Sequence, residues 1–81
     1  MKNEILLNNG LRITKARKLI ISILDKTEQP ISAEDLYEIF KEKEESNLST
    51  IYRNLKILKN KGIVEIVCEI DGISYYRLKG K

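Results

Sequence analysis

The hydrophobic positions of this chain recur with helical spacing as far as Gly62 and then give way to segments rich in β-branched and aromatic residues. A short helix is expected around Glu4 to Asn9, ending at Gly10. A second helix is expected to begin after Thr14, whose side chain can cap it. Its apolar stripe consists of Ala16, Leu19, Ile20, Ile23 and Leu24.

A third and a fourth helix are expected on either side of the polar turn ESNL. Pro30 interrupts the chain, and Ser32 with Asp35 three residues later matches a capping box, so the third helix is expected from about Ala33 to Glu44. Its buried side is expected to hold Leu36, Ile39 and Phe40, with Tyr37 at the border. The stripe of the fourth helix consists of Leu48, Ile51, Leu55 and Leu58. Two helices joined by so short a turn predict a helix-turn-helix.

The last part of the chain predicts a β-hairpin, because the segments IVEIVCE and ISYYRL flank the turn pair Asp71-Gly72. Counting outward from the turn pairs Glu69 with Ser74, Cys68 with Tyr75 and Val67 with Tyr76. Both faces of the hairpin are mixed, so the sequence leaves open which face packs on the helices. The predicted fold is mainly α with a small β-hairpin: a single winged helix-turn-helix domain over residues 1–81, with three to four helices followed by a two-stranded wing.

Composition argues against membrane, metal and catalytic functions. The longest apolar runs, LIISIL and IVEIVC, are far shorter than the ~20 residues that span a bilayer, and the first residues carry no secretory signal. The single cysteine, Cys68, cannot form an internal disulfide, which favours a cytoplasmic location, and it is expected to serve packing. Histidine is absent, so we expect no enzyme, no metal site and no cofactor within this chain.

The charges are segregated between the third and fourth helices, although the net charge is only +3. Acidic residues predominate in the third, whereas between Leu48 and Gly62 every charged residue is basic. With the apolar stripe turned inward, helical geometry places on the opposite face Ser49, Tyr52, Arg53, Lys56 and Asn60.

This polar face suits the major groove of double-stranded DNA, which an α-helix fits. Arg53 can make a bidentate contact to guanine, and Tyr52 can reach a thymine methyl group or a phosphate. Lys59 would suit the flanking phosphates, and Ser49 and Thr50 offer hydroxyl groups at the amino end of the helix, where anions bind. The recognition helix is thus expected at about residues 48–60.

Other interpretations of the same face stay open. It could be a solvated surface, or it could dock on an acidic protein partner in a winged-helix interaction module. RNA binding is less favoured, because readers of single strands need exposed stacking aromatics and this face has one, Tyr52. The tyrosines of the hairpin, Tyr75 and Tyr76, are expected to pack across the strands.

The order of motifs also resembles a known family. The chain contains GLRITKARKLIISIL, then ISAEDLYEIF, then LSTIYRNLKILKNKGIVE, and then a hairpin closing on YYRL. Over roughly positions 10 to 78 these segments resemble the N-terminal winged-helix DNA-binding domain of the ferric uptake regulator family of bacterial metal-responsive repressors.

The resemblance implies operator binding, with Tyr52 and Arg53 facing bases, Arg12 reaching toward the minor groove and Arg17 touching phosphate. It also implies a homodimer, formed on DNA or through a C-terminal dimerisation and metal-sensing domain that would follow the hairpin. Metal sensing is not carried over, because Pro30 and Arg77 stand where the family often has metal ligands. The chain is thus expected to be either one domain of a longer regulator or a short relative.

Overall fold

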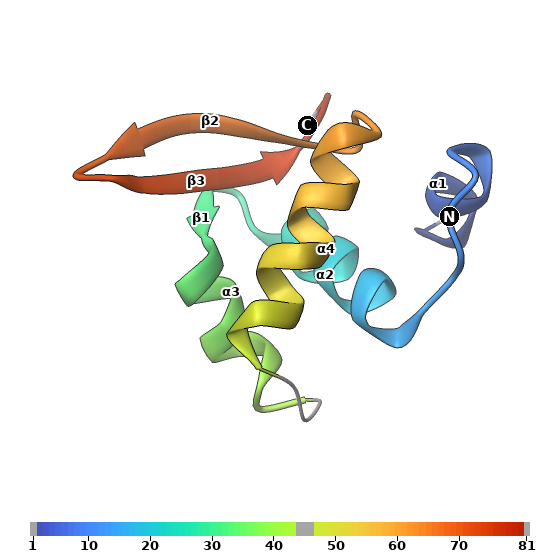
Figure 1. Cartoon of the computed structure of the whole chain (residues 1–81), viewed down its shortest axis with the longest axis horizontal. Helices are drawn as coiled ribbons and strands as arrows, with labels where there is room; N and C mark the ends of the chain where they lie inside the picture. The colour runs from blue at the N-terminus through green and yellow to red at the C-terminus, as the bar shows by residue number, and fades with distance from the viewer. Residues whose placement is uncertain (1, 44–46, 81) are drawn as a thin grey trace.

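The structure is a computed structural model that describes residues 2–43 and 47–80. Four helices precede a β-hairpin, and a short strand before the third helix joins the hairpin in one sheet (Figure 1). The helices are α1 (Lys2–Asn8), α2 (Lys15–Lys26), α3 (Ala33–Phe40) and α4 (Leu48–Asn60). The strands are β1 (Ile31–Ser32), β2 (Val64–Ile70) and β3 (Ile73–Leu78). This is the predicted winged helix-turn-helix, in which α3 and α4 form the helix pair and β2–β3 the wing.

Side-chain caps determine where three of the helices begin. The hydroxyl oxygens of Thr14 and Ser32 each accept a hydrogen bond of 3.1 Å from the backbone N–H three residues later, which confirms both predicted caps. Asn47 caps α4 in the same way, since its Oδ1 accepts the backbone N–H of Thr50 at 2.9 Å. The Asn47 cap was not predicted, although asparagine is among the preferred residues at this position.

Helix α1 agrees with prediction to within two residues, and its stop at Gly10 is confirmed by the positive φ of 72° there. Two details of the predicted third helix are wrong. Helix α3 ends at Phe40, and its predicted end, Glu44, lies outside the described residues. Ile39 is 36% exposed instead of buried, because the buried face of α3 is centred on Ala33, Leu36 and Phe40, and at about 100° per residue Ile39 lies about 90° from that centre.

The sheet is antiparallel in the order β1-β3-β2. The hairpin turn is confirmed, since Asp71 and Gly72 both have positive φ, at 53° and 79°, as a two-residue primed turn requires. Strand β1 was not predicted, because two residues before a helix cap carry no periodic pattern of their own. It pairs Ile31 with Tyr76 and so ties the start of α3 to the wing.

The register of the hairpin agrees with prediction near the turn and departs from it further away. Cys68 faces Tyr75 as expected, but a β-bulge follows and places Ile66, not Val67, opposite Tyr76. The predicted pair Val67–Tyr76 is therefore wrong, because a bulge inserts one extra residue in one strand and shifts every later pair.

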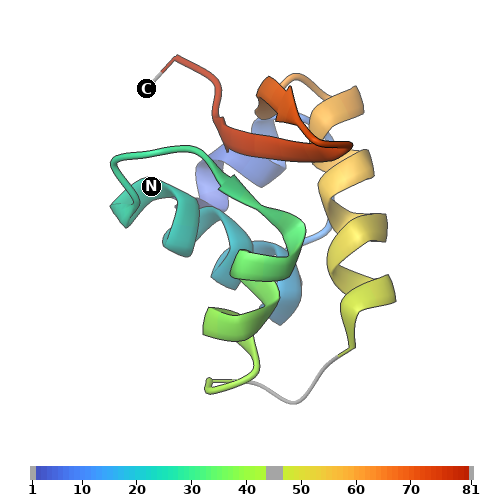
Figure 2. The same ribbon diagram turned by 90° about the vertical axis from the view of Figure 1, so that its left-hand side faces the viewer.

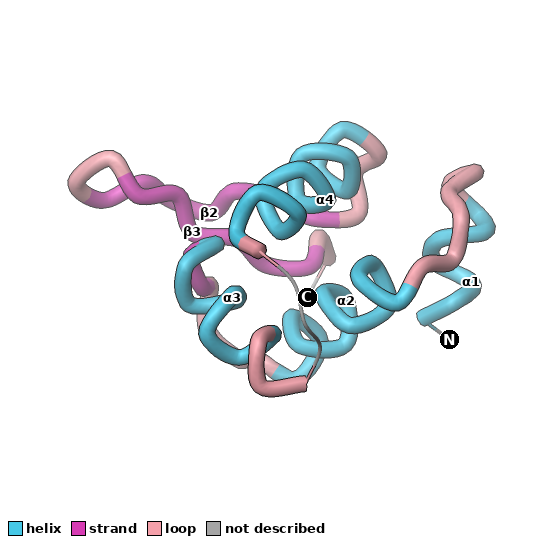
Figure 3. Tube along the Cα trace, turned by 60° about the horizontal axis from the view of Figure 1, so that its bottom comes forward, coloured by secondary structure: helices cyan, strands magenta, loops and turns pink. Residues whose placement is uncertain are grey.

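Only the base of the wing is buried. Val64 and Leu78 face each other across the strands and are 1% and 7% exposed. The hairpin face that carries this pair is therefore the one that packs on the helices. Toward the tip the exposed hydrophobic residues are Ile66, Val67, Ile70 and Ile73. Cys68 is also exposed, so its predicted packing role is wrong. The tip extends away from the helical part of the molecule (Figures 1 and 3).

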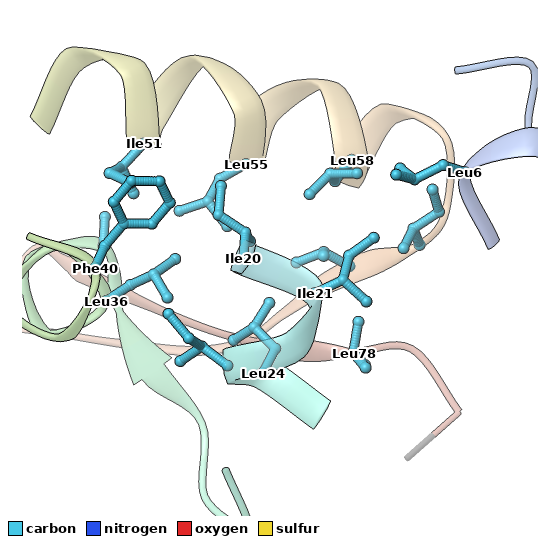
Figure 4. Packing of buried hydrophobic residues seen from close by; sticks show 14 residues of the cluster. Leu6, Ile20, Ile21, Leu24, Leu36, Phe40, Ile51, Leu55, Leu58 and Leu78 are labelled. Carbon is cyan, nitrogen blue, oxygen red and sulfur yellow. The ribbon is translucent and has the colours of Figure 1, made fainter. Parts of the chain in front are cut away.

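The core lies between α4 on one side and α2, α3 and the base of the wing on the other (Figure 4). From α4 it receives Ile51, Leu55 and Leu58, each 0% exposed. The other elements contribute Leu6, Ile20, Ile21, Leu24, Leu36, Phe40 and Leu78. In the described part of the chain, no helix is long and apolar enough to cross a membrane.

Candidate nucleic-acid interface

Helix α4 lies along one edge of the molecule with its polar face uncovered (Figure 2). The exposed residues on this face are Ser49, Tyr52, Arg53, Lys56 and Asn60. Since Ile51, Leu55 and Leu58 are fully buried on the other side, the predicted orientation of the helix is confirmed. The wing borders this face only at Tyr52, and all five residues stay exposed.

The basic side chains of this helix are not neutralised by the rest of the described chain. Arg53, Lys56 and Lys59 are exposed and form no hydrogen bond or ion pair with any residue between 2 and 43 or between 47 and 80. The wing carries its own compensated pair, in which Arg77 Nε lies 2.9 Å from Glu65 Oε2. The positive charge of α4 is therefore available to an anionic ligand.

The amino end of α4 offers fewer free donors than its sequence suggests. Asn47 Oδ1 accepts both the backbone N–H of Thr50, at 2.9 Å, and the Thr50 hydroxyl, at 3.2 Å. Thr50 is half-buried, whereas the neighbouring Ser49 is exposed. Of the two hydroxyl groups expected here, Ser49 thus lies in the open and Thr50 is engaged in the cap.

The two arginines that precede α4 in the chain are linked to each other and to the helix. Arg17 Nε donates to Oδ1 of Asn54 at 3.2 Å, and Arg17 Nη1 donates to the backbone oxygen of Arg12 at 3.1 Å. A guanidinium has five N–H donors, so these two bonds leave others for a phosphate. Arg12 is exposed and Arg17 is half-buried, and the two bonds connect both arginines to α4 through Asn54.

Asn54 is the buried residue that makes this link possible, and it was not singled out from the sequence. It is 9% exposed, and its Nδ2 donates to the backbone oxygen of Thr50 at 3.0 Å while its Oδ1 accepts from Arg17. Its sequence signal is a polar residue between Ile51 and Leu55 on the apolar side of the helix. A buried amide there must find partners, because an unsatisfied one is unfavourable.

A second contact, between α3 and α4, was also absent from the sequence analysis. The Tyr52 hydroxyl donates to Oε2 of Glu34 at 2.6 Å, and this hydrogen bond raises the pKa of Tyr52. The polar face of α4 lacks acids of its own, but the fold brings one from α3. Eighteen residues separate the pair, so no local pattern predicts it.

The tyrosines of the wing differ in their surroundings. Tyr76 faces Ile31 on one side and Ile66 on the other and packs against the core, which confirms its cross-strand role. Tyr75 faces Cys68 and Ser32 and is half-buried. Among the described residues no group of three His, Cys, Asp or Glu side chains is placed to hold a metal ion.

Comparisons with known proteins by sequence and by structure point to the same family. Residues 8–81 match the ferric uptake regulator family. The ferric uptake regulation protein of Bacillus subtilis is 34% identical over 74 residues, which cover 89% of this chain and 50% of that protein. That of Staphylococcus aureus is 34% identical over 76 residues, covering 93% of this chain and 55% of that protein. The chain thus spans about half the length of these relatives.

Solved structures agree. The ferric uptake regulator of Vibrio cholerae superposes with a TM-score of 0.89 at 35% identity, over 100% of this chain and 63% of that one. The regulator from Pseudomonas aeruginosa, solved with manganese, gives a TM-score of 0.85 at 32% identity, over 96% of this chain and 60% of that one. Both similarities extend over the helices and the wing. On the match of sequence and fold together, this chain belongs to the ferric uptake regulator family.

Proposed function

We propose that this chain is the sequence-specific, double-stranded DNA-binding module of a bacterial transcriptional repressor, with α4 in the major groove and the wing along the backbone. The observation that carries the proposal is the exposed face of α4, on which Arg53 and Lys56 have no partner among the described residues. A helix presented in this way matches the width of the major groove.

The surface supports a division of roles between its residues. Tyr52 and Arg53, at the centre of the exposed face, would contact bases, with Lys56 and Ser49 beside them. Lys59 and Arg17 would contact phosphates, and Thr50 would contribute separately at the amino end of the helix, where it bonds to Asn47. Arg12, next to Arg17, would reach toward the minor groove.

The proposal includes the setting of the module. It would act in the cytoplasm as one of two copies on a two-fold symmetric operator, paired on DNA or through a further domain. We assign no cofactor and no catalytic step to the 81 residues. The alternative of an acidic protein partner has no specific support in the structure.

The test is a selection of duplexes from a random pool with the purified chain, followed by fluorescence anisotropy on the selected duplex and a scrambled one. We expect tighter binding to the selected duplex and a fall in affinity with salt, because phosphate contacts release counterions. Amide chemical-shift changes should concentrate at Tyr52, Arg53 and Lys56. Failure to enrich any sequence, or shifts that avoid α4, would contradict the proposal and favour a protein partner.

A further inference from the structure

The contact between Tyr52 and Glu34 has a chemical consequence for DNA recognition. A phenol has one hydrogen to donate, and here it is donated to a carboxylate oxygen at 2.6 Å, a distance typical of a strong, charge-assisted bond. Glu34 lies in the first turn of α3, where the helix dipole favours a negative charge. The helix start is itself fixed by the Ser32 cap and by β1. Tyr52 is thus bonded to a side chain outside its own helix, on a helix whose start is fixed.

The surroundings of the pair determine what Tyr52 can still contact. Glu34, Tyr52 and Tyr76 line a small hollow of about 100 Å³ between α3, α4 and the wing. An ionised carboxylate in this hollow repels phosphate, and the Tyr52 hydroxyl cannot donate to a phosphate while it donates to Glu34. The side chain of Tyr52 nevertheless stays 44% exposed. What remains for DNA is the aromatic ring, together with a hydroxyl oxygen that can accept a hydrogen bond but cannot donate one to phosphate.

We propose that Glu34 is a positioning residue for sequence recognition: it holds the Tyr52 hydroxyl inward, so that the ring contacts a thymine 5-methyl group instead of the hydroxyl contacting a phosphate. This inference rests on the proposed function and deepens it. It chooses between the two contacts open to this tyrosine and adds a residue of α3 to the determinants of specificity. Glu34 acts through Tyr52 and touches no base itself.

The experiment uses the selected duplex and a series in which each thymine in turn is replaced by uracil, which removes only the methyl group. For the unmodified chain we expect one position at which uracil weakens binding about fourfold, the value of one buried methyl group. We call the affinity for the thymine duplex divided by the affinity for the uracil duplex at this position the thymine-to-uracil ratio. In Glu34→Ala the ring of Tyr52 is released, so this ratio should fall toward one. Glu34→Gln keeps an acceptor for the hydroxyl, so it should retain the ratio and bind all duplexes more tightly because a negative charge is removed.

A double-mutant cycle separates positioning from general effects. Tyr52→Phe keeps the ring but lacks the hydroxyl, so it should lose the ratio as Glu34→Ala does, and the double variant should lose no more. The preference at the guanine contacted by Arg53 should be unchanged in all three. That preference also controls for folding, because a misfolded variant would lose it.

The outcomes are distinguishable. A ratio in Glu34→Ala equal to that of the unmodified chain would overturn the inference, and so would an equal loss of affinity on thymine and uracil duplexes. Additive effects in the cycle would overturn it too, as would the absence of any methyl-sensitive position. In each of these cases the chain still selects a sequence, so the proposed function stands. If it selects none, the proposed function fails first.

Discussion

Arg53 and Lys59 differ in what they can contribute, although both are exposed and basic. Arg53 lies at the centre of the polar face of α4, whereas Lys59 lies near the carboxyl end of the helix and outside that face. Replacing Arg53 by alanine should reduce binding by about 1–3 kcal/mol at one base pair and relax the preference there. Replacing Lys59 by alanine should weaken all sequences alike and reduce the salt slope.

The measurement is anisotropy on the selected and scrambled duplexes over a salt series. Lys59→Ala serves as the matched control, because it removes the same unit of charge from the same helix. Equal losses on both duplexes for Arg53→Ala would refute the role in base recognition and leave a role in phosphate binding.

Tyr76 gives the stability of the protein a dependence on alkaline pH. Burial, and secondarily the charge of Glu34, raises the pKa of Tyr76 above its ordinary value of 10.0. Above pH 10 the unfolded chain therefore loses this proton while the native state retains it. The native state binds more protons there, so the free energy of unfolding should fall as pH rises through this window.

Urea unfolding at pH 9 and at about pH 11 measures the slope of this effect. Tyr76→Phe preserves the packing against the core and removes the titrating hydroxyl, so its stability should fall less over the same interval. Lysines and the other tyrosines titrate in both proteins, and the comparison cancels them. Identical slopes would contradict the assignment to Tyr76.

Among the elements, α4 depends on its amino-terminal cap. Asn47 accepts two hydrogen bonds from Thr50, and its replacement by alanine should lower the free energy of unfolding by about 1 kcal/mol. Asn47→Asp should keep the cap, because a carboxylate accepts the same bonds and suits a helix amino end. It should nevertheless weaken DNA binding, since it adds a negative charge beside the interface.

Thermal unfolding and anisotropy on both variants separate the two effects. The expected pattern is a loss of stability in Asn47→Ala only and a loss of affinity at low salt in Asn47→Asp. A destabilised Asn47→Asp would refute the capping role, and unchanged affinity would place this end of α4 away from DNA.

The accuracy of prediction varied among the elements with the range of the interactions that form them. The Thr14 and Ser32 caps were predictable because each bond spans three residues. The polar face of α4 was predictable because helical geometry alone fixes it. Strand β1 and the bulge at Val67 depend on pairing with a strand distant in sequence or on local distortion of that pairing, and no periodicity encodes either.

The contacts that refine the interface were hidden for the same reason. In the sequence, Glu34 is one of several acidic residues on a helix face that is expected to be solvated. Only the packing of α3 against α4 brings its carboxylate to Tyr52. In the sequence, Asn54 is a polar residue that interrupts the apolar side of the fourth helix. Only the packing of α2 against α4 supplies Arg17 as its hydrogen-bond partner. The sequence therefore predicted which face of α4 is exposed, and the tertiary structure determined how the side chains on and beside that face are held.

At the scale of the whole molecule, one core holds every element that approaches the proposed DNA surface. Residues of α1, α2, α3, α4 and both wing strands meet in a single cluster. Leu58 of α4, Val64 of β2 and Ile63 between these two elements all belong to that cluster, so we expect α4 and the base of the wing to move together. The module should therefore bind as a rigid body, with little rearrangement of the backbone.

A single rigid module of this size should bind weakly, because one helix reads only a few base pairs. Joining two copies through a flexible linker of about 40 residues, long enough to span the ~34 Å between half-sites one helical turn apart, makes the second binding event intramolecular. The tandem chain should then bind a two-half-site duplex about 10²–10⁴ times more tightly than a duplex with one half-site scrambled.

The matched control is a tandem chain with Arg53→Ala in one copy only. Its charge changes by one unit, but it should lose most of the gain, because avidity requires that both copies engage their half-sites specifically. Anisotropy at fixed salt compares the two proteins on both duplexes. A tandem chain that gains equally on the scrambled duplex would mean that phosphate contacts alone carry the affinity, and α4 would then be an electrostatic surface without a reading function.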